Sequence, residues 1–550
     1  MTKILTPNLL WAGFDDSLPL KETKLKSETI NNAVFNYLYF SGRAVNKNRV
    51  RIYGVFAEQK IKTDNTILIL PDVKDLVDVE LVTHFSNLGF NVLAVDLRGI
   101  NEFNADYTVY PNEVNYANYE NCEETFTKLK KSAKETCWYE WCAVARYSIN
   151  FIVSKFPKAK IGVLGLKYGA NVAWQLAGTD SRVNALAVAF GAGWMAYNGI
   201  FKHSNKEVDL NDEKLRFIAG LDAHSYAQNV KVPVMFVSTT NSDVFDCDRA
   251  LDTLQRIDNQ NKTWFNFTTL SKDVLSGECL TDIDLFFNKF IARKKYQFPH
   301  VPKIKSEYDD GFIDYYVECS KCEDIETVTL FASDNDENPS ERVWYILNQD
   351  GVEDGVYHFK RRLYGLIEFE IAYAVVKYKN GLTISSKLNY QQLKVQSNTK
   401  IPNVIFSSSR LPTSFIVGNV KTKLMANVFS VTSLYDYVQG PFKILGVSTK
   451  NSILSYAIKK FSSGLSNQSL IKFDSYTSVG DEVRITLKTK SGEDYFVNLE
   501  LKSDNKWQNL TVSFSEFKSE AGVPLKKFEE LVLLKISTKG SVLVNNFLIL

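Results

Sequence analysis

The chain has 550 residues, 45% of them hydrophobic and 23% charged, a composition typical of folded proteins with about three domains. Its 65 basic and 63 acidic side chains nearly cancel and are mixed along the chain, which argues against nucleic acid as a partner. No stretch approaches the ~18 apolar residues of a membrane span, and no signal peptide is evident. Seven scattered cysteines, with one CxxC pair at Cys319 and Cys322, fit a reducing compartment. We therefore expect a cytoplasmic protein without a membrane partner.

Residues 1–298 alternate short apolar strands with helical stretches. The strands include TILILPD, NVLAVDLRG, KIGVLGL and VPVMFVSTT, and WYEWCAVARYSINFIVSKF is the longest expected helix. Continuous apolar strands separated by helices are typical of a parallel sheet covered on both faces. We predict an α/β domain here, with a helical cap near residues 195–230.

After residue 298 the pattern changes to strands alone. Alternating runs such as IETVTLFAS and AYAVVKYKNGLTISS fill residues 299–398, and DEVRITLKTKSG and GSVLVNNFLIL belong to residues 399–550. Breaks rich in proline, lysine and polar residues, YQFPHVPKIKSEYDDG and QSNTKIPN, separate the three parts. We predict two β-sandwiches following the α/β domain.

The stretch IGVLGLKYGANVAWQLAG, residues 161–178, has the shape of a nucleophile elbow: a buried strand, a tight glycine turn and a helix. Gly165 and Gly169 permit the sharp turn and close packing, so the central side chain projects above the sheet at a helix N-terminus. The central residue is Lys167, where a hydrolase of this kind needs a serine or cysteine nucleophile. The sequence therefore predicts an elbow without its usual reacting atom.

Together with LILPD, NVLAVDLRG and DSRVNALAVAFGAGW in the expected order, this elbow makes the first half of the chain resemble the α/β-hydrolase superfamily, nearest its dienelactone hydrolase and acetyl xylan esterase branches. The resemblance implies an oxyanion hole formed by the N–H of Tyr168 and by an N–H near Asp72 or Val73. It implies no cofactor and no metal.

The resemblance also fixes where the other triad members should lie. The acid is expected just after VPVMFVSTT, where Asp243, Asp246 and Asp248 occur. The histidine is expected after the next strand, but no histidine lies between His224 and His300. Because nucleophile and base are both missing by residue type, the usual Ser-His mechanism is not expected.

Three interpretations of Lys167 stay open. It fills a decayed pocket, paired with Asp243 or Asp246; it binds a carboxylate or phosphate beside the helix N-terminus; or it acts as a neutral base or nucleophile. Trp194 follows a strand at the carboxyl edge of the sheet, where α/β proteins bind ligands, and is predicted to line the pocket. The cap residues His203 and His224 are interpreted as surface or cap histidines.

The two sandwiches resemble non-catalytic modules. Residues 299–398 are similar to an immunoglobulin-like spacer, and KWQNLTVSFSEFKSEAG with GSVLVNNFLIL is similar to galactose-binding-like domains. The leading hypothesis is a degenerate esterase-like protein that binds a carbohydrate, a small acidic ligand or a protein partner without catalysis. The alternative is an active carboxylic ester hydrolase of acetyl xylan esterase type, acting on acylated oligosaccharides.

Overall fold

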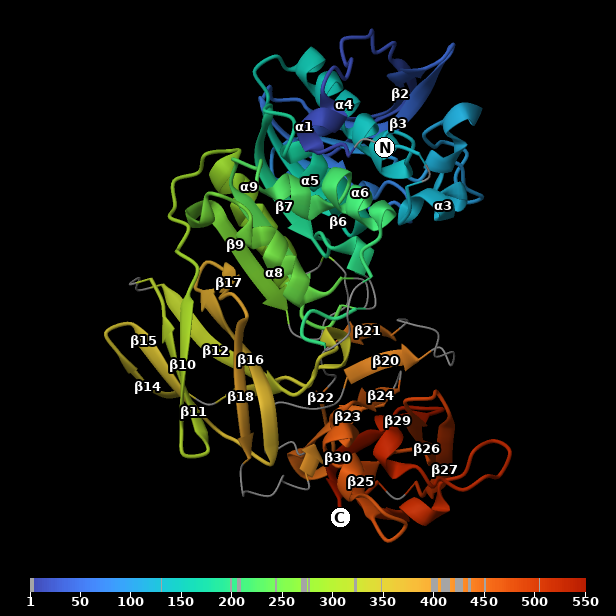
Figure 1. The fold of residues 1–550 in the computed structure, drawn as a ribbon, viewed down its shortest axis with the longest axis vertical. Helices are drawn as coiled ribbons and strands as arrows, with labels where there is room; N and C mark the ends of the chain where they lie inside the picture. The colour runs from blue at the N-terminus through green and yellow to red at the C-terminus, as the bar shows by residue number, and fades with distance from the viewer. Residues whose placement is uncertain are drawn as a thin grey trace.

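The computed structural model describes residues 4–129, 131–197, 200–204, 209–242, 245–268, 275, 277–320, 324–347, 349–396, 404–406, 416–420, 429–433, 437–449, 452–503 and 505–550. Figure 1 shows three bodies: an α/β part from blue to green, yellow sheets below it, and orange and red sheets at the C-terminal end.

A nine-stranded sheet organises the first part of the chain, with the strands in the order β1-β2-β3-β5-β4-β6-β7-β8-β9. β1, β2 and β3 are antiparallel neighbours, β3 is antiparallel to β5, and the strands from β5 to β9 run parallel. The strand bounds are β1 (Thr23–Ile30), β2 (Ala33–Val45), β3 (Asn48–Gln59), β4 (Asn65–Leu70), β5 (Asn91–Val95), β6 (Lys160–Leu166), β7 (Val183–Ala189), β8 (Val234–Thr239) and β9 (Thr263–Thr268).

Helices cover both faces of this sheet, as continuous apolar strands require. On β4, Ile67 and Ile69 belong to one core cluster with α2 and α9, whereas Leu68 and Leu70 belong to the other with α4, α5 and α8. The helix bounds are α1 (Pro7–Trp11), α2 (Val79–Asn87), α3 (Glu123–Phe126), α4 (Cys137–Lys155), α5 (Tyr168–Ala177), α6 (Asp212–Gly220), α7 (Ala223–Ala227), α8 (Cys247–Gln255) and α9 (Gly277–Phe290). No helix in these described ranges is long and apolar enough to cross a bilayer.

Two antiparallel sheets follow in the middle of the chain. One has the order β10-β11-β15-β14, and the other has the order β13-β12-β16-β17 with β18 also paired to β16. The bounds are β10 (Lys303–Asp309), β11 (Phe312–Glu318), β12 (Ile325–Asp334), β13 (Tyr345–Leu347), β14 (Gln349–Glu353), β15 (Val356–Arg362), β16 (Leu366–Tyr378), β17 (Thr383–Ser385) and β18 (Asn389–Gln396).

The C-terminal part contains two more antiparallel sheets, β22-β23-β30-β25-β28 with β19 beside β30, and β21-β20-β24-β29-β26-β27. In the core of this part, the buried rings of Phe473 and Phe547 stack on each other with their centroids 5.2 Å apart. The bounds are β19 (Val404–Phe406), β20 (Ile416–Val420), β21 (Phe429–Ser433), β22 (Tyr437–Gln439), β23 (Leu445–Ser448), β24 (Ile453–Ser455), β25 (Leu470–Tyr476), β26 (Asp481–Thr489), β27 (Asp494–Leu501), β28 (Gln508–Ser513), β29 (Leu531–Thr538) and β30 (Leu543–Ile549).

The middle sheets contact the parts on either side through specific polar bonds. Phe267 of β9 donates its N–H to Ser385 Oγ of β17 at 2.9 Å. Toward the C-terminal part, Lys460 Nζ donates to Asp334 Oδ1 at 2.7 Å, and Lys459 Nζ donates to Asp336 Oδ1 at 3.2 Å. All four of these ionic side chains are at most one quarter exposed, so the contacts join the bodies through shielded rather than surface charges.

Candidate functional site

The turn between β6 and α5 has the backbone geometry of a nucleophile elbow. Lys167 adopts φ 49° and ψ −116°, a strained conformation for a residue with a Cβ, and its N–H donates to Ala189 O at 2.8 Å. A Cβ on Gly169 would collide with the carbonyl oxygens of Leu70 and Pro71, and a Cβ on Gly165 would lie 2.6 Å from Ala173 Cβ. The strand order and this elbow decide the architecture. The first part of the chain has an α/β-hydrolase-like fold.

At the elbow of this hydrolase-like domain, Lys167 is half-buried at the N-terminus of α5. Among the described residues it forms no ion pair within 4.0 Å, and Asp246 is not its partner. Its electrostatic neighbour is Asp72, which follows β4 and is buried. Burial and the nearby Asp75 raise the pKa of Asp72 to about 6, while Lys167 and Lys74 act in the opposite direction.

The predicted oxyanion-hole residues lie around this lysine. Tyr168 begins α5, and its ring lines a cavity beside the elbow. Asp72 and Val73 both lie in the loop after β4 and are buried. The Asp72 carboxyl group therefore places a titratable acid where an esterase would gather hydrogen-bond donors for a developing negative charge.

The acid loop, residues 240–246 between β8 and α8, holds helix α8 and the middle sheets. Asp243 lies outside the described residues. Asp246 is the N-cap of α8, and its Oδ1 accepts the N–H groups of Asp248 at 2.9 Å and Arg249 at 3.3 Å. Burial and the neighbouring Asp248 raise the pKa of Asp246 to about 6.

Asn241 of the same loop is buried against the middle sheets. Its Nδ2 donates to Arg342 O at 2.8 Å, and its Oδ1 accepts from Trp344 Nε1 at 2.9 Å. The second position of the loop is thus occupied by a structural amide.

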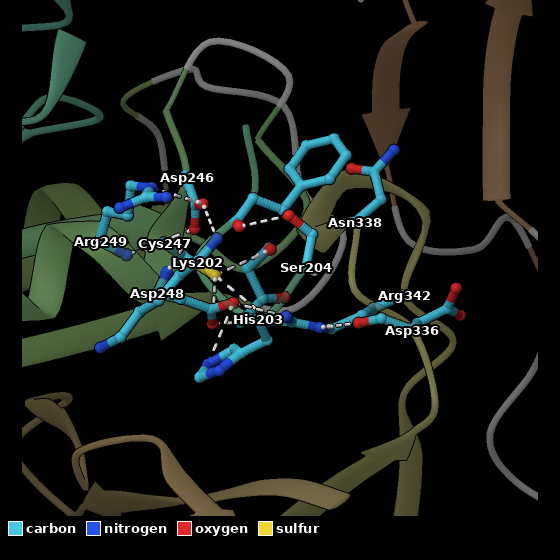
Figure 2. A network of polar contacts seen from close by, with 12 residues as sticks. Lys202, His203, Ser204, Asp246, Cys247, Asp248, Arg249, Asp336, Asn338 and Arg342 are labelled. Atoms are coloured by element: carbon cyan, nitrogen blue, oxygen red, sulfur yellow. Dashed lines mark hydrogen bonds and ion pairs between the residues drawn. The ribbon is translucent and has the colours of Figure 1, made fainter. Parts of the chain in front are cut away.

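Asp248, in the first turn of α8, forms a two-bond ion pair with Arg342 of the middle part (Figure 2). Arg342 donates from Nη1 to Oδ1 at 2.8 Å and from Nη2 to Oδ2 at 2.5 Å, and both side chains are almost fully buried. Burial opposes the charge of Asp248, but Arg342 outweighs it and lowers the pKa of Asp248. Arg342 Nε also donates to Asp336 O at 3.1 Å. Asp248 therefore anchors α8 to the middle part of the chain, and it is not available to orient a catalytic base.

Of the two cap histidines, His224 is buried and His203 is partly buried, with 5% and 13% of their side chains exposed. His203 stacks on Tyr390 of β18, with ring centroids 4.0 Å apart, and its Nε2 lies 3.7 Å from Asp248 Oδ2. Burial lowers the pKa of His203. These contacts engage His203 with β18 and with the first turn of α8.

His224 belongs to a cluster that shapes the loop after β7. Its Nδ1 lies 3.0 Å from Asp222 Oδ1, its ring stacks on Trp194 at 4.3 Å, and Asp222 also accepts the N–H groups of Trp194 at 2.7 Å and Met195 at 2.8 Å. Ser225 Oγ lies 3.5 Å from His224 Nε2 but donates to Ile218 O. These contacts have the order of a Ser-His-Asp triad, yet they are buried beneath Trp194 and hold its loop in place.

The elbow pocket is a cavity of about 70 Å³ at the carboxyl edge of the sheet. Tyr168 and Trp194, both predicted as site residues, lie in its wall with Asp246 and Arg249. Trp194 Nε1 is buried and has no hydrogen-bond partner among the described residues. The complete set of lining residues is Phe126, Thr127, Tyr168, Gly193, Trp194, Met195, Tyr197, Ile200, Phe201, Ser242, Phe245, Asp246, Arg249, Asn338, Pro339 and Ser340.

Sequence reasoning missed one contributor to this site. Residues 338–340 of the middle part close one side of the pocket, and nothing in their local sequence indicated this. Asp72 was expected near the elbow, and its carboxyl group interacts electrostatically with Lys167. Within the described ranges, no three His, Cys, Asp or Glu side chains are placed to hold a metal ion.

Solved esterase structures are similar to about half of this chain. A cold-adapted esterase from an Arctic intertidal metagenomic library matches at 13% identity and a TM-score of 0.33, over 49% of this chain and 99% of its own. The acetyl xylan esterase of Paenibacillus sp. R4 matches at 12% and 0.36, over 52% of this chain and 92% of its own. Acetyl xylan esterase 1 of Thermoanaerobacterium sp. JW/SL YS485 matches at 16% and 0.32, over 46% and 82%.

No protein-family model and no curated protein sequence matches the chain. At these TM-scores and identities, the activity of the solved esterases is not transferred to this protein.

Proposed function

We propose that the hydrolase-like domain binds a small anionic ligand, a carboxylate or phosphate such as an acidic sugar, at the elbow and does not hydrolyse esters. The observation that carries this proposal is Lys167 itself, held at φ 49° at the N-terminus of a ten-residue helix. The helix N-terminus offers free N–H groups and a partial positive charge, and the ammonium adds a full one.

Three features argue against ester hydrolysis. The elbow residue is a lysine, and no histidine occurs in residues 225–299. The Asp72 carboxyl group beside the elbow would disfavour an oxyanion while it is ionised. Asp246 and Asp248 of the acid loop region are already used to cap α8 and to bind Arg342. Each of these would have to change before the usual triad could operate.

The elbow pocket suggests the size and character of the ligand. A cavity of about 70 Å³ suits a small acid or the acidic end of a larger molecule. The Trp194 and Tyr168 rings offer flat apolar walls of the kind that pack against sugar rings, and the buried Trp194 Nε1 offers one donor. Arg249, whose guanidinium lies 4.6 Å from the Tyr197 ring centroid, supplies a cation to the wall, whereas Lys167 stands at the adjacent elbow and is not itself a lining residue.

For the β-rich C-terminal half, we propose an immunoglobulin-like spacer over residues 299–398 and a galactose-binding-like sandwich over residues 399–550. A carbohydrate or a protein partner is the expected ligand of that half, and a cytoplasmic location remains our expectation. Phe514 and Phe517 are buried, so neither offers a platform for a sugar ring.

A thermal-shift screen tests the binding proposal. The parent protein is compared with Lys167→Met, which removes the charge while keeping much of the bulk, and with the exposed control Lys47→Met. At a hundredfold excess over its dissociation constant, a true ligand adds about 2.7 kcal/mol of stability. We expect sugar acids or phosphates to stabilise the parent and Lys47→Met but not Lys167→Met. A screen without any stabilising acid, or with equal stabilisation of all three proteins, contradicts the proposal.

Hydrolysis of p-nitrophenyl acetate separates this proposal from the esterase alternative. The parent is expected to show no turnover above that of a mock purification. Turnover that co-purifies with the chain and disappears in Lys167→Ala would establish the alternative instead.

A further inference from the structure

A second cavity, of about 730 Å³, lies between the edge of the first sheet and the middle sheets. We call it the interface cavity. It shares no lining residue with the elbow pocket. Its wall combines Gln260 and Asn261 before β9, residues 263–265 of β9, the connecting residues 300–302, residues 303–305 of β10, and residues 318–320 and 387–389. The volume and the position between two folded units are typical of small-molecule sites.

Lys387 is a cation in this cavity without an acidic partner. Its half-buried ammonium donates to Gln260 Oε1 at 3.1 Å, and no carboxylate of the described residues lies within ion-pair distance of it. Burial lowers the pKa of Lys387, which shows that its charge is incompletely compensated. An anion entering the cavity would supply the missing counter-charge.

The rest of the lining is also more cationic than anionic. Lys303 and Lys305 lie along the same wall, and Glu318 is its one described acidic side chain. Glu318 is the direct cross-strand neighbour of Lys303 in the β10–β11 pair, so its charge lies beside that lysine.

The main chain of β9 adds a neutral donor. Because Phe267 N–H points away from β8 to Ser385 Oγ, the N–H of Phe265, two residues earlier, lies on the same outer edge of the sheet. Phe265 also belongs to the lining, together with the apolar side chains of Val301, Ile304 and Leu388. The cavity thus pairs cationic and N–H groups with an apolar wall.

We propose that the interface cavity binds an organic anion with an apolar body, its acidic group at Lys387 and its apolar part against Val301, Ile304 and Leu388. This site is separate from the elbow pocket and does not depend on the function proposed for Lys167. A ligand there would contact both the hydrolase-like domain and the middle sheets.

Titration of the full chain with 8-anilinonaphthalene-1-sulfonate, an aromatic anion whose fluorescence rises in apolar sites, tests the proposal. Lys387→Met should weaken binding about tenfold or more, because a charge-assisted bond is lost, whereas Lys387→Arg should retain it. Leu388→Trp, which fills the cavity without changing charge, should also weaken binding. The exposed control Lys526→Met should bind like the parent.

Circular dichroism and melting temperature are measured for each variant to establish that it is folded. Lys167→Met is included because Lys167 is not a lining residue of the interface cavity, and it should leave this binding unchanged. Parent-like affinity in both Lys387→Met and Leu388→Trp overturns the proposal. Loss of binding in Lys167→Met alone would do the same, by moving the dye to the elbow.

Discussion

Removing Arg342 should destabilise the protein strongly at neutral pH, because it leaves Asp248 buried without its partner. The two side chains are 0% and 2% exposed, and the pair makes two bonds. Breaking a buried pair from one side costs about 3–5 kcal/mol. Protonation of Asp248 limits this cost, because neutralising a carboxyl group with an ordinary pKa takes about 4 kcal/mol at pH 7 and about 1.5 kcal/mol at pH 5. The penalty of Arg342→Met should therefore shrink as the pH falls.

Differential scanning calorimetry of the parent, Arg342→Met and the double variant Asp248→Leu/Arg342→Met measures this effect. At pH 7 the first transition of Arg342→Met is expected roughly 8–16 °C below that of the parent, and at pH 5 the difference should fall by about half or more. The double variant, with apolar groups in both positions, should recover most of the loss. As a control, Lys231→Met removes a mostly exposed ion pair with Asp258 and should shift the transition by about 2 °C or less.

The reasoning is refuted if Arg342→Met melts within 2 °C of the parent at pH 7. It is equally refuted if the penalty does not change between pH 7 and pH 5, or if the double variant melts no higher than Arg342→Met at pH 7.

Three further predictions concern the elbow. Burial raises the pKa of Asp72 from 3.8 to about 6, so the folded state loses stability as the pH rises through this window. The free energy of unfolding of Asp72→Asn, measured with urea, should therefore exceed that of the parent by about 2–3 kcal/mol at pH 7.5. Below pH 4 the two free energies should be equal. Gly169→Ala should lower the melting temperature sharply or prevent folding, because its Cβ would meet the carbonyl of Pro71, whereas Gly464→Ala has open space and should melt like the parent. Lys167→Ser should show no esterase activity above the mock level, since no base is in place to take the serine proton, and high activity would reveal a hidden one.

The sequence allowed the first part of the fold to be predicted because its strands are continuously apolar and its elbow has glycines where the turn needs them. Trp138 and Trp141 belong to the longest helix expected from the sequence, and they are 1% and 0% exposed. The roles of Asn241 and Asp248 were not predictable, because their partners Arg342 and Trp344 lie about 100 residues away on another sheet. A hydrogen bond over such a separation leaves no periodicity in the sequence.

The histidines show the same limit at shorter range. A histidine in a polar insertion favours a surface position, yet His224 is buried where it stacks on Trp194, and His203 is partly buried where it stacks on Tyr390. The raised pKa of Asp72 likewise depends on how the loop after β4 is covered, which residue type alone does not indicate.

The bond between α8 and the middle sheets has a consequence for how this protein can evolve. Selection for a stable interface and selection for a catalytic acid would act on the same short segment, because Asn241 and Asp248 already serve the interface. A mutation that freed either residue for catalysis would loosen the attachment of the neighbouring sheets before any activity appeared. A catalytic acid in this segment would therefore require compensating changes in the neighbouring sheets at the same time.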